Sequence, residues 1–327
     1  MRTAWLAGAL LLGAFASTAA EIDPALPHYL PRPVAFPSGA SYVTPAGAIA
    51  IIGYNDMEEM LRALDARFAA VHPGFRFALK LKGTRTAPGA LAQGRSAFAP
   101  MGAEFSPAER TTYRAATGGE PLSFRIAHAS LHGPALSGPL AIIVHPDNPL
   151  PSLTLGQVAQ VFGGQVKAWG GLGLAGQWAG QAVHPSGLNP ETALGIFLRT
   201  RVLGRASFTP DLMGYAQSAD VVKRVAADPL AIGFAAAVRA TAGVRIVAIA
   251  ASPHEAPVAL NEESIRAGRY PLDRYLLIYV RQPIEPFVGE YLRLVLSSEG
   301  QRAIADGTLG YLPLNAGEIA AERAKLR

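Results

Sequence analysis

The chain has 327 residues, of which 50% are hydrophobic and 16% charged, so it can form one large or two medium folded domains and is not intrinsically disordered. Its formal net charge is +5, and the basic residues are spread along the chain instead of forming a block, which argues against nucleic acid as a partner. Because the chain has no cysteine, a thiol nucleophile, a disulfide and a cysteine-ligated metal are excluded.

The first twenty residues have the pattern of an export signal. Arg2 supplies a basic start, residues 6–15 form an apolar run, and small residues lead up to Ala20. The apolar run is too short to cross a bilayer. We therefore expect residues 1–20 to be a signal peptide that is cleaved, and the product to be a periplasmic protein without stable membrane insertion.

Residues 21–46 form a proline-rich segment that contains six prolines. Such a segment cannot form a helix interior or a central strand. We expect an extended N-terminal arm.

Alternating strand and helix patterns follow this arm. Short apolar or alternating runs predict strands at 48–52, 75–81, 97–101, 122–126, 140–144, 232–235, 245–249 and 275–280. Apolar residues at three- and four-residue spacing predict helices at 57–71, 107–116, 154–162, 190–203, 220–227 and 287–305. This alternation is typical of an α/β protein with largely parallel sheets.

Three polar turns, at residues 53–57, 83–86 and 186–192, each follow a predicted strand and precede a helix. The free backbone N–H groups of a helix N-terminus favour an anion, and several such ends together can bind one without a metal. The alternative is that the polar side chains only cap their helices. The turns by themselves leave both interpretations open.

The sequence offers no catalytic motif. The glycines 171, 173 and 176 match a dinucleotide-binding spacing, but a tryptophan-containing loop follows where a helix should begin. His128 and His132 have the spacing of helical metal ligands but lie in a predicted strand and turn. We therefore predict no enzyme, no cofactor and no metal.

Several runs of residues also carry a family resemblance. They are HPDNPL at 145–150, LTL at 153–155, VAQVFGG at 158–164, PLAIGF at 229–234, YPLDR at 270–274, SSEGQ at 297–301 and GYLPL at 310–314. In this order they resemble the periplasmic phosphate-binding proteins of ABC transporters, over about residues 48–314. The resemblance implies an α/β, two-lobed periplasmic binding protein (type 2) fold with two crossover segments. It places residues 47–130 and 243–327 in the first lobe and 131–242 in the second.

The resemblance further implies a monomeric receptor that captures an oxyanion, phosphate above all, between its lobes and delivers it to an ABC transporter permease. The three polar turns then correspond to the family's three ligand loops. The candidate ligand-binding residues are Tyr54, Asn55, Asp56, Thr84, Arg85, Thr86, His184, Ser186, Asn189 and Thr192.

The sequence departs from the family pattern in these loops and, at His184, just before the third of them. His184 stands in place of a family arginine, Arg85 introduces a guanidinium in the second loop, and Glu191 adds a carboxylate to the third. The alternative function is therefore a binding-protein-like domain that binds no phosphate and has a periplasmic regulatory or organic-ligand-binding role.

Overall fold

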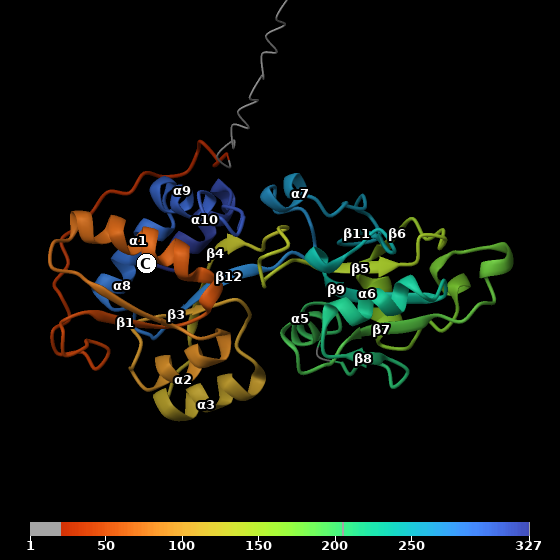
Figure 1. Ribbon diagram of the computed structural model, residues 1–327, viewed down its shortest axis with the longest axis horizontal. Helices are drawn as coiled ribbons and strands as arrows, with labels where there is room; N and C mark the ends of the chain where they lie inside the picture. The colour runs from red at the N-terminus through yellow and green to blue at the C-terminus, as the bar shows by residue number, and fades with distance from the viewer. Residues whose placement is uncertain (1–20, 205, 327) are drawn as a thin grey trace, which may run out of the picture.

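The protein is described here by a computed structural model for residues 21–204 and 206–326, which form two lobes side by side (Figure 1). The predicted signal peptide lies outside these described residues. Each lobe has its own hydrophobic core. Among the described residues, no helix has the length and apolar character needed to cross a membrane.

The first lobe combines a parallel strand pair with an antiparallel sheet. Strands β1 (Ile49–Gly53) and β2 (Phe77–Leu81) are parallel, and β12 (Tyr275–Val280) lies antiparallel between β3 (Ala99–Met101) and β4 (Leu122–His128). The helices are α1 (Glu58–Val71), α2 (Ala87–Ala92), α3 (Pro107–Thr117), α8 (Pro286–Val295), α9 (Ser298–Ala305) and α10 (Ala316–Ala324).

The second lobe is built on a five-stranded sheet in the order β10-β5-β9-β7-β8. These strands are β10 (Arg245–Ile246), β5 (Leu140–Val144), β9 (Ala231–Ala236), β7 (His184–Leu188) and β8 (Met213–Tyr215). A parallel pair, β6 (Ser152–Thr154) and β11 (Ala248–Ala250), adds to it. The helices are α4 (Leu155–Phe162), α5 (Ala193–Arg201), α6 (Ser218–Ala226) and α7 (Glu262–Arg266).

The sheets are mixed, which corrects the expectation of largely parallel sheets. Strands β5 and β12 run antiparallel to their neighbours, whereas β1 with β2, and β7 with β8 and β9, are parallel. Both antiparallel strands come directly after a crossover between lobes, so they enter their sheets without the helical return that makes successive strands parallel.

The second lobe extends further along the chain than the resemblance implied. Residues 243–272 were expected in the first lobe, but β10 pairs with β5, and β11 pairs with β6. Ile265 and Leu272 are buried in the core of the second lobe. The two crossovers therefore lie at about residues 129–139 and 273–274, because the apolar residues between 244 and 272 pack against the second sheet.

Two helices near the C-terminus also differ from expectation. The helix predicted over 287–305 is divided into α8 and α9, because Ser297 interrupts it and caps α9 by accepting a hydrogen bond from Gly300 N at 3.2 Å. Helix α10 was not predicted, and it begins at a capping box formed by Asn315 and Glu318.

The N-terminal arm packs against the first lobe. Leu26 and Tyr42 are buried in its core, and Tyr29 N donates a hydrogen bond to Glu299 Oε2 at 2.7 Å. The arm is therefore part of the folded lobe.

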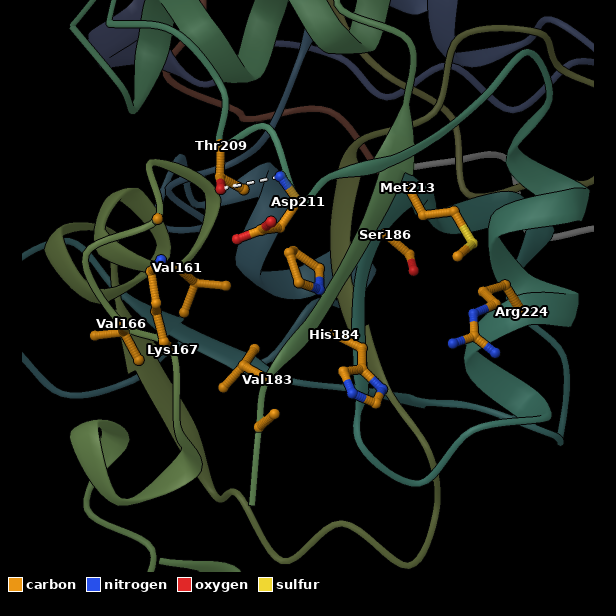
Figure 2. Close-up of a pocket in the computed structure, with 13 residues that line it drawn as sticks. Val161, Val166, Lys167, Val183, His184, Ser186, Thr209, Asp211, Met213 and Arg224 are labelled. Carbon is orange, nitrogen blue, oxygen red and sulfur yellow. Dashed lines mark hydrogen bonds between the residues drawn. The ribbon is translucent and has the colours of Figure 1, made fainter. Parts of the chain in front are cut away.

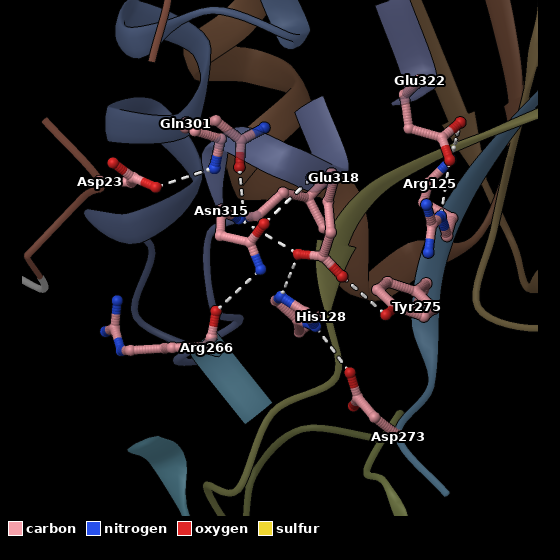
Figure 3. Close-up of polar contacts among 12 residues, drawn as sticks. Asp23, Arg125, His128, Arg266, Asp273, Tyr275, Gln301, Asn315, Glu318 and Glu322 are labelled. Atoms are coloured by element: carbon pink, nitrogen blue, oxygen red, sulfur yellow. Dashed lines mark hydrogen bonds and ion pairs between the residues drawn. The ribbon is translucent and has the colours of Figure 1, made fainter. Parts of the chain in front are cut away.

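A buried ionic cluster lies beside the second crossover, where His128 sits between two carboxylates (Figure 3). Its Nδ1 lies 2.6 Å from Asp273 Oδ2, and its Nε2 lies 2.9 Å from Glu318 Oε2. Burial opposes a charge on the ring, but the hydrogen bonds and charges of Asp273 and Glu318 outweigh it and raise the pKa of His128 to about 9. This histidine is therefore a buried cation that joins β4 to the crossover and to α10.

Candidate functional site

The first two polar loops lie next to each other at one edge of the first lobe. Gly53 at the end of β1 pairs with Leu81 at the end of β2, and Gly83 N donates a hydrogen bond to Gly53 O at 2.9 Å. The carboxyl ends of parallel strands are where α/β proteins bind ligands. The structure therefore brings residues 53–57 and 83–86 together.

In the first loop, Tyr54 and Asp56 point inward to the first crossover. The Tyr54 hydroxyl lies 2.9 Å from Ser137 Oγ, and burial raises the pKa of Tyr54 to about 12. The Asp56 carboxylate accepts hydrogen bonds from Leu136 N at 2.7 Å and from Tyr311 OH at 2.9 Å. These two side chains hold the crossover in place, while Asn55 is exposed.

The threonine side chains of the second loop mainly stabilise the conformation of the loop through hydrogen bonds to backbone groups. Thr84 Oγ1 accepts a hydrogen bond from Gly102 N at 3.1 Å, and Thr86 Oγ1 donates one to Gly83 O at 2.7 Å. Arg85 reaches toward α3, where its Nη1 lies 2.6 Å from Glu109 Oε2.

The third loop begins later than the sequence suggested. Asn189 follows β7, and Thr192 caps α5 by accepting a hydrogen bond from Gly195 N at 3.1 Å. The hydroxyl of Thr192 donates to Asn189 O at 2.7 Å. Thr192 therefore acts as the helix cap that the alternative interpretation described, at the carboxyl end of β7.

Ser186 lies within strand β7 and not in the turn predicted at 186–192, and His184 is the first residue of the same strand. A strand rises about 3.3 Å per residue, so His184, at the amino end, is about 13 Å from the carboxyl end where α5 begins. The structure does not bring His184 and Ser186 together with the other candidate residues. Pro185 and Gly187 are poor strand formers, so the local sequence predicts a turn where the structure has the end of a strand.

His184 has a partner of its own at the amino end of the strand. Its Nδ1 lies 2.8 Å from Asp228 Oδ2, and Arg224 Nη2 lies 2.5 Å from the same oxygen. These contacts, with a hydrogen bond from Leu230 N, hold the pKa of Asp228 below its usual value even though burial alone raises it.

Sequence reasoning missed Arg274 as a residue of the lobe junction. Arg274 lies in the second crossover and is buried, and its Nη2 donates a hydrogen bond to Gly102 O at 2.8 Å. Its guanidinium carbon lies 5.7 Å from the centre of the Phe197 ring in the second lobe. The YPLDR run that carries the resemblance contained this arginine, but nothing local indicated its place between the lobes.

A cavity of about 290 Å³ opens between the lobes near the second loop. Arg85 and Ser106 line it from the first lobe, and Glu191, Ile196 and Arg199 line it from the second. Two guanidinium groups and a carboxylate from opposite lobes therefore share one cavity. Such a site can bind an anion through charge-assisted hydrogen bonds when the lobes close.

Comparison with known proteins identifies relatives over most of the chain. A family model described as a PBP superfamily domain matches residues 40–299. The phosphate-binding protein PstS of two strains of Pseudomonas aeruginosa is 31% identical over 313 residues, which is 92% of this chain and 90% of that protein.

Solved structures share the fold at lower sequence identity. PstS from Borrelia burgdorferi is similar with a TM-score of 0.55 at 14% identity, covering 82% of this chain and 98% of that one. An ABC-type phosphate transport receptor from Vibrio cholerae is similar with a TM-score of 0.54 at 17% identity, covering 80% of this chain and 98% of that one.

Proposed function

Because the chain belongs to the PBP superfamily and to its phosphate-binding protein family, we propose that it captures phosphate between its lobes and delivers it to an ABC transporter. It is a transport receptor and not an enzyme. The observation that carries the proposal is the cavity between the lobes, with Arg85 on one side and Arg199 on the other. Closure around the anion would remove it from water and strengthen both interactions.

We propose that the second and third loops provide the ligand contacts. Arg85 and the backbone N–H groups of the second loop would bind from the first lobe. Asn189, Thr192 and the first turn of α5 would bind from the second lobe, with Arg199 adding charge. Tyr54 and Asp56 would form the floor of the site at the crossover. We further propose that the receptor is a monomer and that a transporter permease is its partner.

Replacing Arg85 with alanine is expected to weaken phosphate binding by about 1.5 kcal/mol, the lower end for loss of a charged hydrogen bond. The lower end applies because the side chain is 43% exposed and already paired with Glu109. Isothermal titration calorimetry with phosphate measures this. The matched control is Arg62→Ala on α1, a 66% exposed arginine that is likewise paired with a glutamate. Equal phosphate affinity in the Arg85 variant and the unmodified protein would remove Arg85 from the site.

The second candidate function is a binding-protein-like domain that does not take phosphate. It is favoured by Glu109, which neutralises Arg85, and by Glu191, which places a second carboxylate in the cavity. The same calorimetry separates the two functions. Phosphate binding in the unmodified protein supports the transport function, and no heat at millimolar phosphate supports the alternative.

We propose that export removes residues 1–20 and leaves Glu21 as the first residue in the periplasm. Expression of the full chain in a bacterium, followed by cell fractionation and N-terminal sequencing, tests this. A chain lacking residues 2–20 serves as the control and is expected to stay in the cytoplasm. A full-length chain that keeps Met1 and remains in the cytoplasm would contradict the proposal.

A further inference from the structure

The second lobe contains a cavity of about 400 Å³ that is separate from the one between the lobes. It lies where β7 and β8 begin, and its lining comes from α4, the loop after α4, β7, the segment before β8, and α6. Parallel strands have their ligand-binding loops at their carboxyl ends, whereas this cavity lies at the amino ends of β7 and β8. It is therefore at the opposite end of these strands from the proposed phosphate site. The two cavities share no lining residue.

Two buried donors at this cavity lack an acceptor among the described residues. Ser186 is 1% exposed, and its hydroxyl has no hydrogen-bond partner there. Arg224 donates through Nη2 to Asp228, but its buried Nε has no partner. Buried polar groups are nearly always hydrogen-bonded, so two unpaired donors beside one cavity indicate that an acceptor belongs there.

The charges of the lining residues define the ligand further. Lys167 lies on one side of the cavity and Arg224 on the other, with Ser186 and His184 between them (Figure 2). Lys167 has no carboxylate partner among the described residues. Asp211 adds one negative charge at an exposed position. Because Asp228 already pairs with Arg224, the two cations are matched by two carboxylates, so the cavity accommodates at most one further negative charge, and a dianion would meet repulsion from Asp211 and Asp228.

The rest of the lining is mostly apolar. Besides Gly164 and the polar Thr209, whose hydroxyl accepts a hydrogen bond from Asp211 N, it consists of Val161, Val166, Ala182, Val183, Pro185 and Met213. A small ligand site typically combines such a wall with a few polar groups that fix one end of the ligand. A short, branched hydrocarbon group fits this wall better than a bare inorganic anion.

We propose that this cavity is a second ligand site, which binds a small monocarboxylate with a branched apolar body. The carboxylate accepts hydrogen bonds from the Ser186 hydroxyl and Arg224 Nε and pairs with Lys167, while the hydrocarbon part contacts the valines and Met213. This site functions independently of phosphate capture between the lobes.

Methyl NMR spectra of methionine-labelled protein, titrated with isovalerate, test the proposal. Met213 lines the cavity, whereas Met57, Met60 and Met101 are buried in the first lobe and serve as internal controls. The Met213 methyl signal, which the Met213→Leu variant assigns, is expected to shift until it saturates as isovalerate is added. The chemical shifts of the other three methionines are expected to stay unchanged. Isoamyl alcohol and phosphate are expected to leave the Met213 signal unchanged.

Variants then connect the shift to the proposed contacts. Ser186→Ala is expected to weaken isovalerate binding about fivefold, as for loss of one hydrogen bond. Lys167→Gln, at an exposed position that folding tolerates, is expected to weaken it about threefold. The control is Lys223→Gln, an 80% exposed lysine on α6 outside the cavity.

Three results would overturn the proposal. They are an unmoved Met213 signal with isovalerate, an equal response to phosphate or the alcohol, and unchanged affinity in the Ser186 and Lys167 variants. Because Met213 reports only on this cavity, none of these results bears on phosphate binding between the lobes. A Met213 signal at the position seen in the unmodified protein without ligand shows that the second lobe, which carries these substitutions, is folded in each variant.

Discussion

Replacing His128 with leucine is expected to lower the free energy of unfolding by about 3–5 kcal/mol, because it leaves two buried carboxylates without their shared cation. Asp273 and Glu318 contact opposite nitrogens of the ring, and leucine can donate to neither. Chemical denaturation measures the loss. The His128→Gln variant keeps one donor group, so its free energy of unfolding is expected to lie between that of the leucine variant and that of the unmodified protein.

The matched control is His28→Leu, which removes a histidine that is 80% exposed and pairs with Glu299 on the surface. An exposed ion pair contributes about 0–1 kcal/mol, so this variant is expected to change stability little. A loss at His128 no larger than that at His28 would contradict the role assigned to the buried cluster.

The same cluster predicts how stability depends on pH. The pKa of His128 is about 9 in the folded protein and 6.5 at its ordinary value, so the folded state holds the proton more tightly. The stabilisation is fully present below about pH 6.5 and is lost as pH rises through about 9. Urea unfolding between about pH 6 and about pH 9.5 is expected to show this decline, and His128→Leu to flatten it. A stability of the unmodified protein that stays constant over this range would contradict the prediction.

Replacing Gly187 with alanine is expected to destabilise the second lobe by about 3 kcal/mol, the upper end for overpacking a core. A Cβ atom at this position would overlap the ring of Phe234. That ring cannot move aside, because Phe162 packs edge-on against it at 5.2 Å and Phe208 stacks on it at 5.8 Å between ring centres. Thermal and chemical denaturation measure the effect.

Gly180→Ala is the control for this substitution. Gly180 lies in the same lobe, and a Cβ there would meet nothing within 4 Å. Its replacement is expected to change stability by less than about 1 kcal/mol. Equal stabilities of the two alanine variants would show that the Phe234 ring can rearrange.

The sequence alone determined the family, the architecture and most of the elements. Strands β5 and β12 were predicted with their observed bounds, because continuous apolar runs of that length are typical of buried strands. Helix α4 was predicted from its Thr154 cap and its apolar spacing. The family indicated by the motifs is confirmed by the superfamily match over residues 40–299 together with the 31% identity to PstS of Pseudomonas aeruginosa. These features depend on residues close together in the chain.

Only the tertiary structure decided which residues meet. His184 and Ser186 lie in a strand because β9 and β8 pair with that segment on both sides, and those partners are distant in sequence. The position of Arg274 between the lobes depends on Gly102 and Phe197 in the same way. The unpaired hydroxyl of Ser186 likewise becomes visible only after every neighbour is placed. Local patterns specify strands, helices and caps, whereas burial and hydrogen-bond partners result from contacts between segments that are far apart along the chain.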